Sequence, residues 1–166
     1  MSVRVGQGFD VHPFSDDPAR RLVLGGVVFT GERGLAGHSD ADVIAHAVAD
    51  ALLGAAGLGD IGQHFPDTDP ALAGVDSIGL LRQAVAHVRA AGWEPGNVDC
   101  TVVLEEPKLS PRRDEVQRIL SEAVGVPVTV KGKRAEGLGS LGRGEGIACL
   151  AVALVTGSTS AGGGEW

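Results

Sequence analysis

Apolar residues recur with helical spacing in the second quarter of the chain. Four of them are separated by four, four and three residues and so share one face of a helix: Ile44, Val48, Leu52 and Ala55. Capping residues predict that this helix begins near Ser39 or Asp40, and glycine predicts that it ends at Gly54 or Gly57. We expect the rest of the chain to be organised around this helix.

Shorter patterns fill the remaining sequence. Before the central helix they predict a strand at residues 3–5 that ends in a loop at Gly6 to Phe9, and a hairpin at 21–30 that turns at Gly25 and Gly26. After it they predict a helix from Asp76 or Ser77 to Gly92, a strand at 98–104 and a helix from Ser110 and Pro111 to Val124. The last two predicted elements are a strand at 126–130 and a long buried strand at 147–155. Turn-forming residues predict loops at 60–70 and 131–146. This order predicts an α+β fold, a single compact domain over residues 1–156 with one mixed β-sheet packed with helices. A Gly/Ser-rich disordered tail is expected at 157–166.

Charge and composition exclude some partners. The 166 residues carry a formal charge of −7 and offer no basic stripe, so we expect no nucleic-acid partner. The longest apolar run, 147–155, is too short to cross a bilayer, and the N-terminus lacks an apolar signal region, so no membrane partner is expected. Cys100 and Cys149 lie outside any CxxC spacing and are expected to be buried thiols in a reducing compartment, which predicts a cytoplasmic protein.

Residues 37–70 concentrate histidines and acids and contain neither lysine nor arginine. They hold three histidines and six aspartates: His38, His46, His64, Asp40, Asp42, Asp50, Asp60, Asp67 and Asp69. So many acceptors either repel one another or gather around a positive charge. A bound divalent cation is the simplest candidate.

Spacing selects three residues as a ligand set for that cation. Asp10 and His12 are two residues apart, so on a strand their side chains point to the same face, and His46 comes from the central helix. Three protein ligands with a free fourth position are typical of catalytic zinc. Two other interpretations stay open: Asp42, His46 and Asp50 form a solvent-exposed helix face, or His46 is a hydrogen-bonded core residue.

Common catalytic motifs are missing from the sequence. There is no HExxH of a zinc peptidase, no GxSxG elbow and no GxxxxGK[ST] phosphate loop. The pair Gly6 and Gly8 is followed by Phe9, Asp10 and His12 and not by a helix start, so it is no dinucleotide fingerprint.

Four longer segments carry a resemblance to a known family. They are GQGFDVHPF at 6–14, AGHSDADVIAHAVADALLGAAGLGDIGQHFPDTDP at 36–70, EPKLSP at 106–111 and LGRGEGIA at 141–148. Together they resemble the 2-C-methyl-D-erythritol 2,4-cyclodiphosphate synthases of the non-mevalonate isoprenoid pathway, over the chain up to about Val155. The resemblance implies a homotrimer with sites at the subunit interfaces. It also implies a metal-dependent phosphorus–oxygen lyase that converts 4-diphosphocytidyl-2-C-methyl-D-erythritol 2-phosphate to the cyclic diphosphate and CMP.

The resemblance also implies roles for individual residues. One Zn²⁺ per subunit would be held by Asp10, His12 and His46, and a second ion, Mg²⁺ or Mn²⁺ on the substrate diphosphate, by Glu136. The substrate contacts would be His38 and Ser39 at the methylerythritol phosphate, Asp60, Gly62, Phe65 and Asp69 from the loop over the sugar, Leu104 to Ser110 with Pro107, Lys108 and Leu109 at the cytidine, and Arg143 at a phosphate. The resemblance assigns no role to Asp42, Asp50 or His64; we expect an ordering or structural role for the two aspartates and an exposed position for His64.

The chain departs from the family pattern at two places. Lys133, Arg134 and Ala135 stand where many members have threonines, and Ser140 stands where an aromatic residue is frequent. Lys133 and Arg134 are therefore expected to contact phosphate through charge instead of a hydroxyl. Two alternative functions are a zinc-dependent phosphodiesterase acting on a nucleotide diphosphate, and an oligomeric metal-dependent protein that binds isoprenoid diphosphates in a central cavity.

Overall fold

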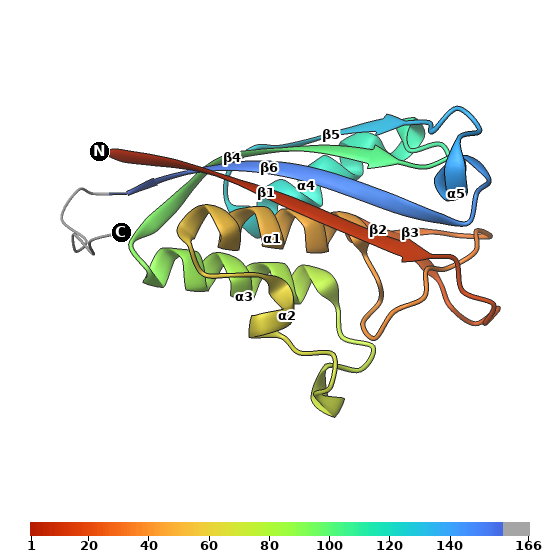
Figure 1. Cartoon of the computed structure of the whole chain (residues 1–166), viewed down its shortest axis with the longest axis horizontal. Coiled ribbons are helices and arrows are strands. Elements are labelled where there is room, and N and C mark those ends of the chain that lie inside the picture. The colour runs from red at the N-terminus through yellow and green to blue at the C-terminus, as the bar shows by residue number, and fades with distance from the viewer. Residues whose placement is uncertain (158–166) are drawn as a thin grey trace.

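A computed structural model of the chain describes residues 1–157 (Figure 1). Its main sheet has four strands in the order β1-β6-β4-β5: β1 (Ser2–Pro13), β6 (Gly146–Gly157), β4 (Trp93–Val103) and β5 (Val128–Lys133). The β4–β5 pair is parallel and the other two pairs are antiparallel, so the sheet is mixed, as predicted. The hairpin of β2 (Leu22–Leu24) and β3 (Val27–Phe29) forms a separate two-stranded sheet and turns at Gly25 and Gly26.

The helices cover one face of the main sheet. They are α1 (Val43–Ala56), α3 (Ser77–Ala90) and α4 (Arg113–Val124), and shorter segments are α2 (Ile61–His64), α5 (Gly139–Gly142) and the 3₁₀ turns η1 (Pro70–Leu72) and η2 (Ser110–Arg112). Helix α1 lies directly under β1 and β6 (Figure 1). No helix within residues 1–157 is long and apolar enough to span a membrane.

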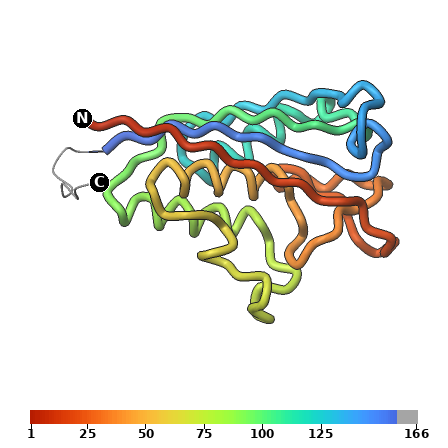
Figure 2. Tube along the Cα trace, in the orientation of Figure 1, coloured from red at the N-terminus to blue at the C-terminus, as the bar shows by residue number. Residues whose placement is uncertain are grey.

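Strand β1 does not end at Gly6 as predicted. It continues through Asp10 and His12 to Pro13 and pairs with β6 along its whole length. A Cβ at Gly6 or Gly8 would overlap the backbone of α1, so these glycines permit close strand–helix packing and do not mark a loop. Figure 2 shows the first and last strands side by side.

The predicted burial of β6 holds for the face toward the helices, whereas Leu150 and Val152 on the other face are exposed. Its antiparallel neighbours leave one face of the sheet uncovered, whereas the predicted pattern is typical of parallel strands with helices on both sides. The uncovered surface, here called the apolar sheet face, consists of exposed side chains of β1 and β6: Val3, Val5, Phe9, Val11, Leu150 and Val152.

The N-cap of helix α1 lies three residues after Ser39 and two after Asp40, the two predicted caps. Its N-cap is Asp42, whose carboxylate accepts the N–H groups of Ile44 and Ala45 and, in addition, those of Gly25 and Gly26 in the hairpin turn. Asp42 is fully buried, so the interpretation of its helix face as solvent-exposed is wrong. The helix ends at Ala56 with Gly57 in the left-handed conformation, in agreement with the prediction.

Other boundaries differ by short segments. The predicted loop at 60–70 contains the single turn α2, because Asp60 caps it through the Gln63 N–H, and the start of η1. The predicted helix at Ser110 begins as η2 without a side-chain cap and becomes α-helical at Arg113. Strand β5 continues to Lys133, the loop after it contains α5, and β6 extends to Gly157; the rest of the expected tail lies outside the described residues.

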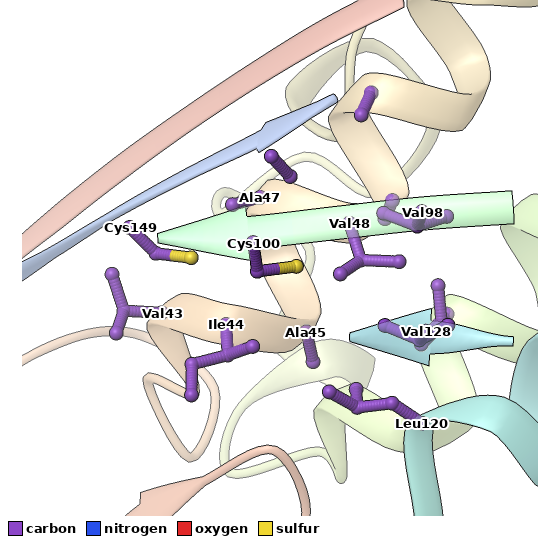
Figure 3. Packing of buried hydrophobic residues seen from close by; sticks show 14 of the residues in the cluster. Val43, Ile44, Ala45, Ala47, Val48, Val98, Cys100, Leu120, Val128 and Cys149 are labelled. Atoms are coloured by element: carbon purple, nitrogen blue, oxygen red, sulfur yellow. The ribbon is translucent and has the colours of Figure 1, made fainter. Parts of the chain in front are cut away.

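The core fills the space between the sheet and its helices (Figure 3). Cys100 and Cys149, on neighbouring strands, are free and fully buried among aliphatic side chains, as predicted. Contact with Cys100 and burial raise the pKa of the Cys149 thiol well above its ordinary value. This thiol is therefore neutral and chemically unreactive.

Candidate metal centre and substrate cavities

Asp10, His12 and His46 meet beneath the sheet. Asp10 and His12 are alternate residues of β1 and face α1, and His46 lies in the first turn of that helix. Asp10 Oδ2 is 3.0 Å from His12 Nε2 and 3.0 Å from His46 Nδ1. One possible ligand atom from each residue lies within 4.8 Å of the others. The three residues selected by spacing are thus a candidate metal site.

The arrangement of His12 and Asp10 favours a bound cation between their side chains. His12 Nδ1 lies 2.8 Å from the carbonyl oxygen of Ala36, and this carbonyl can only accept, so Nδ1 carries the hydrogen. The other nitrogen, Nε2, is buried and lies 3.0 Å from Asp10 Oδ2. Two electron-rich atoms face each other there, which is favourable when a proton or a metal ion lies between them.

The pKa values of Asp10 and His12 reflect their close contact. Burial by itself would raise the pKa of Asp10, but the hydrogen bonds and positive charges of His12 and His46 outweigh it and lower the pKa to about 2. Burial by itself would lower the pKa of His12, but the hydrogen bond and charge of Asp10 outweigh it and raise this pKa. Asp10 is therefore ionised at neutral pH, as a metal ligand must be.

The far side of the His46 ring contacts two buried serines. Nε2 is 2.9 Å from Ser77 Oγ and 3.2 Å from Ser39 Oγ. Ser77 Oγ in turn donates a hydrogen bond to the carboxylate of Asp40. Sequence reasoning missed Ser77, because a serine before an apolar helix is typical of a cap; the actual cap of α3 is Asp76. No short motif signals this contact.

A cavity of about 530 Å³ opens beside the triad. Its wall includes Asp10, His12 and His46, together with four predicted substrate residues: His38, Ser39, Gly62 and Phe65. Asp60 and Asp69 do not line it. Their carboxylates cap α2 and η1, and the backbone carbonyl of Asp69 lies 3.1 Å from His38 Nε2.

The residues without an assigned function have structural partners. Asp50 accepts the Ile61 N–H at 2.7 Å and so fixes the start of α2. His64 is half-buried, and its Nε2 lies 2.8 Å from the Leu58 carbonyl oxygen. The Asp50 contact thereby positions Ile61, which lines the cavity.

A second cavity of about 270 Å³ lies at the other edge of the sheet. Eight predicted residues line it, six from the segment 104–110 and two from the end of β5 and the loop after it: Leu104, Glu105, Pro107, Lys108, Leu109, Ser110, Lys133 and Arg134. Arg113 and Lys131, which sequence reasoning did not select, add positive charge to the wall. The Glu105 carboxylate accepts the Ala135 N–H at 2.8 Å, which ties the two sides of this cavity together.

Like Asp60 and Asp69, two further predicted residues lie outside both cavities in the single chain. Glu136 is exposed and has a positive φ of 54°, a conformation that non-glycine residues adopt at a cost in energy. Arg143 is exposed, and its Nε donates to Glu145 at 2.6 Å.

The sequence is similar to those of known proteins over most of its length. A profile described as the YgbB family matches residues 3–156. A protein of Cupriavidus metallidurans named 2-C-methyl-D-erythritol 2,4-cyclodiphosphate synthase is 55% identical over 158 residues, which are 93% of each chain. A bifunctional enzyme IspD/IspF of an Anaeromyxobacter species is 56% identical over 156 residues, which are 92% of this chain and 40% of that enzyme. The chain thus spans about two fifths of that longer relative.

The fold is also similar to that of a solved structure. The complex of Plasmodium falciparum IspF with CDP superposes with a TM-score of 0.81 at 33% identity and covers 95% of this chain and 98% of that one. The α+β domain with its mixed sheet is therefore shared with a cytidine-nucleotide complex.

Proposed function

The chain belongs to the YgbB family, and from this membership we propose that it converts 4-diphosphocytidyl-2-C-methyl-D-erythritol 2-phosphate to 2-C-methyl-D-erythritol 2,4-cyclodiphosphate and CMP. The observation that carries the proposal is the triad of Asp10, His12 and His46 at the wall of a cavity large enough for a phosphorylated sugar. The second, basic cavity supplies a place for the nucleotide.

The triad is suited to a zinc ion. Two imidazoles and one carboxylate are common zinc ligands, and they leave a fourth position for a substrate oxygen. When bound there, zinc would neutralise and polarise a phosphate. We assign Glu136 to a second ion, Mg²⁺ or Mn²⁺, which prefers oxygen ligands and commonly keeps contacts with substrate phosphates.

The reaction needs no protein nucleophile. An oxygen of the 2-phosphate attacks the β-phosphorus in line, the new P–O bond closes the ring, and the bond from the β-phosphorus to the bridging oxygen breaks. That oxygen leaves with the electron pair as part of CMP. The protein contributes positioning and charge neutralisation, which are the main sources of catalysis in phosphoryl transfer.

Each cavity binds one end of the substrate. His38, Ser39, Gly62 and Phe65 hold the methylerythritol phosphate, and Leu104, Pro107, Lys108 and Leu109 hold the cytidine. Lys133, Arg134 and Arg143 contribute positive charge to the phosphates. Asp60 and Asp69 contribute by capping α2 and η1, two turns whose residues line the first cavity, together with any direct contact to the sugar.

A homotrimer would unite the two halves of the site. The metal triad belongs to the β1 edge of the sheet and the basic cavity to the β5 edge, which is the opposite one. A cyclic assembly can bring the β5 edge of one subunit to the β1 edge of the next. The apolar sheet face supports such an assembly, because large exposed apolar patches mark interaction sites. We place the enzyme in the cytoplasm, in keeping with its two free thiols.

Phosphorus NMR tests the proposed reaction directly. Zinc-loaded protein with the cytidyl substrate and Mg²⁺ should release CMP and give a cyclic diphosphate in equal amounts. Linear phosphate products without the ring would instead favour the phosphodiesterase, and binding without turnover would favour the binding protein. His46→Ala should abolish CMP release, whereas His64→Ala, which changes a histidine outside the triad, should retain it. Undiminished CMP release by His46→Ala would refute the metal assignment.

A further inference from the structure

The contacts behind His46 form a chain of three side chains. His46 Nε2 meets Ser77 Oγ at 2.9 Å, and Ser77 Oγ meets Asp40 Oδ1. The second oxygen of Asp40 accepts the backbone N–H of Ser77 at 3.2 Å. Ser77 is almost fully buried at the first turn of α3, so its hydroxyl group has no access to bulk water.

This chain has a fixed hydrogen-bond direction. An ionised carboxylate only accepts hydrogen bonds, so the single hydrogen of the Ser77 hydroxyl points to Asp40. Ser77 Oγ must then accept from His46, which places the ring hydrogen on Nε2. The lone pair of the neutral ring is consequently on Nδ1, the nitrogen 3.0 Å from Asp10.

We propose that Asp40 and Ser77 are positioning residues that orient the His46 ring and hold its Nδ1 lone pair toward the metal ion. Neither residue touches the ion or the substrate. They act through His46 in the way that hydrogen-bond partners behind metal-bound histidines commonly do. The inference rests on the proposed metal site and is independent of which reaction that site catalyses.

The same contact joins two helices at the cavity. Asp40 precedes α1 and Ser77 opens α3, so the hydrogen-bond chain connects the starts of both helices behind the metal ligand. Ser39 Oγ, 3.2 Å from His46 Nε2, is a second and more distant acceptor, and it already accepts the Ala41 N–H. Ser77 is therefore the principal partner of this nitrogen.

Zinc affinity is the first measurement. Full-length Ser77→Ala and Asp40→Asn are titrated with Zn²⁺ against a chromophoric chelator, and the Co²⁺-loaded proteins are compared by visible spectroscopy. Each variant should bind Zn²⁺ about 10- to 100-fold more weakly, and its Co²⁺ bands should shift, because the ligand ring is less firmly oriented. Asp76→Asn is the matched control: Asp76 caps the same helix through Ile78 but does not contact His46.

The double variant separates positioning from general destabilisation. If Asp40 acts through Ser77, Asp40→Asn should weaken Zn²⁺ binding by less than about twofold once Ser77→Ala is present, because contacting residues in one network are not additive. Fully additive losses, unchanged affinity in both single variants, or an equal loss in Asp76→Asn would each overturn the proposal.

A measurement on the unsubstituted protein keeps the test decisive if Ser77→Ala does not fold. In the zinc-loaded protein labelled with ¹⁵N-histidine, His46 should show its ring hydrogen on Nε2, protected from exchange with water. A ring hydrogen on Nδ1, or one that exchanges as rapidly as that of a solvent-exposed histidine, would contradict the proposal. Loss of zinc binding and loss of cyclisation are measured separately, so this proposal can fail while the proposed function stands.

Discussion

Gly8 of β1 lies directly against the backbone carbonyl of Ala47 in α1, with no room for a Cβ between them. Two residues further along the same strand, Asp10 approaches His46 of the same helix to 3.0 Å. The close strand–helix packing therefore sets the spacing of the metal triad.

Gly8→Ala should disturb both the fold and the triad. The added methyl group must push β1 and α1 apart, and overpacking of this kind costs about 1–3 kcal/mol or more. We expect a lower free energy of unfolding in urea together with weaker Zn²⁺ binding. Gly54→Ala is the control, because the same methyl group meets only ordinary contacts there and should raise helix stability by about 0.5–1 kcal/mol. Equal stabilisation by both substitutions would contradict the packing argument.

Asp10→Asn should leave the assembly intact. An open catalytic site does not hold the fold together, and asparagine keeps the shape of the side chain while removing its charge. We expect an unchanged elution volume in size-exclusion chromatography and Zn²⁺ binding weakened by more than about 100-fold, beyond the losses seen for residues behind a ligand. Dissociation or unfolding of this variant would show that the site has a structural role.

The stability of the metal-free protein in acid should depend on Asp10. The folded pKa of Asp10, about 2, is below the ordinary value of 3.8, so its ionised form stabilises the fold above pH 4, and this contribution is lost as the pH falls toward 2. The difference between the folded and the ordinary pKa of Asp10 corresponds to about 2 kcal/mol in the free energy of unfolding. The raised pKa of His12 has the opposite effect, present below pH 6.5 and lost as the pH rises. Urea unfolding of chelator-treated protein between pH 2 and 5 should show the acid step, and Asp10→Asn should lack it.

Asp42→Ala should be strongly destabilising. Its carboxylate caps α1 and also satisfies the Gly25 and Gly26 N–H groups, so the substitution leaves up to four backbone donors without their acceptor. With about 1 kcal/mol for the cap and about 1–3 kcal/mol for each unsatisfied buried donor, we expect a loss of at least 3 kcal/mol. Asp60→Ala, which removes an exposed cap, should cost about 1 kcal/mol or less in the same thermal or urea measurement. A similar cost for both would argue against the role of the hairpin contacts.

The apolar sheet face should be required for assembly. Phe9→Glu places a charge on this face, where Phe9 is 55% exposed in the single chain, and should shift the protein from trimer to monomer in sedimentation experiments. Ala86→Glu introduces the same charge at an exposed residue of α3, a helix on the opposite face of the sheet, and should leave the trimer unchanged. A monomeric unsubstituted protein would refute the proposed assembly.

The fold could be predicted from the sequence where local patterns decide structure. The apolar stripe of α1, the glycines of the hairpin turn and the alternation in β4 all lead to the observed elements. Prediction was wrong where a tertiary contact decides: Gly6 and Gly8 look like loop residues until α1 is packed on them. The exposure of Leu150 and Val152 was missed for a similar reason, because an apolar run does not reveal what covers each face of a strand.

In the candidate site, too, local patterns identified some residues, whereas others depend on tertiary contacts. Alternation along β1 and one helical residue were sufficient to select Asp10, His12 and His46. Ser77 could not be selected, because it is 31 residues from His46 in the sequence and meets it only when α3 packs beside α1. Glu136 and Arg143 were selected by resemblance alone, and within one chain neither lines either of the two cavities described above.

The antiparallel pairing of β1 with β6 also determines where the chain can be extended. Ser2 pairs with Gly157 at one end of the sheet, whereas Asp10 and His12 lie toward the other end, where Pro13 pairs with Gly146. At about 3.3 Å per residue, roughly 30 Å separates Ser2 from the metal triad. Another protein domain can therefore be fused before Ser2 without approaching the cavity beside Asp10, His12 and His46 of the same subunit. For engineering, an affinity tag or a partner enzyme is best attached at that end of the sheet.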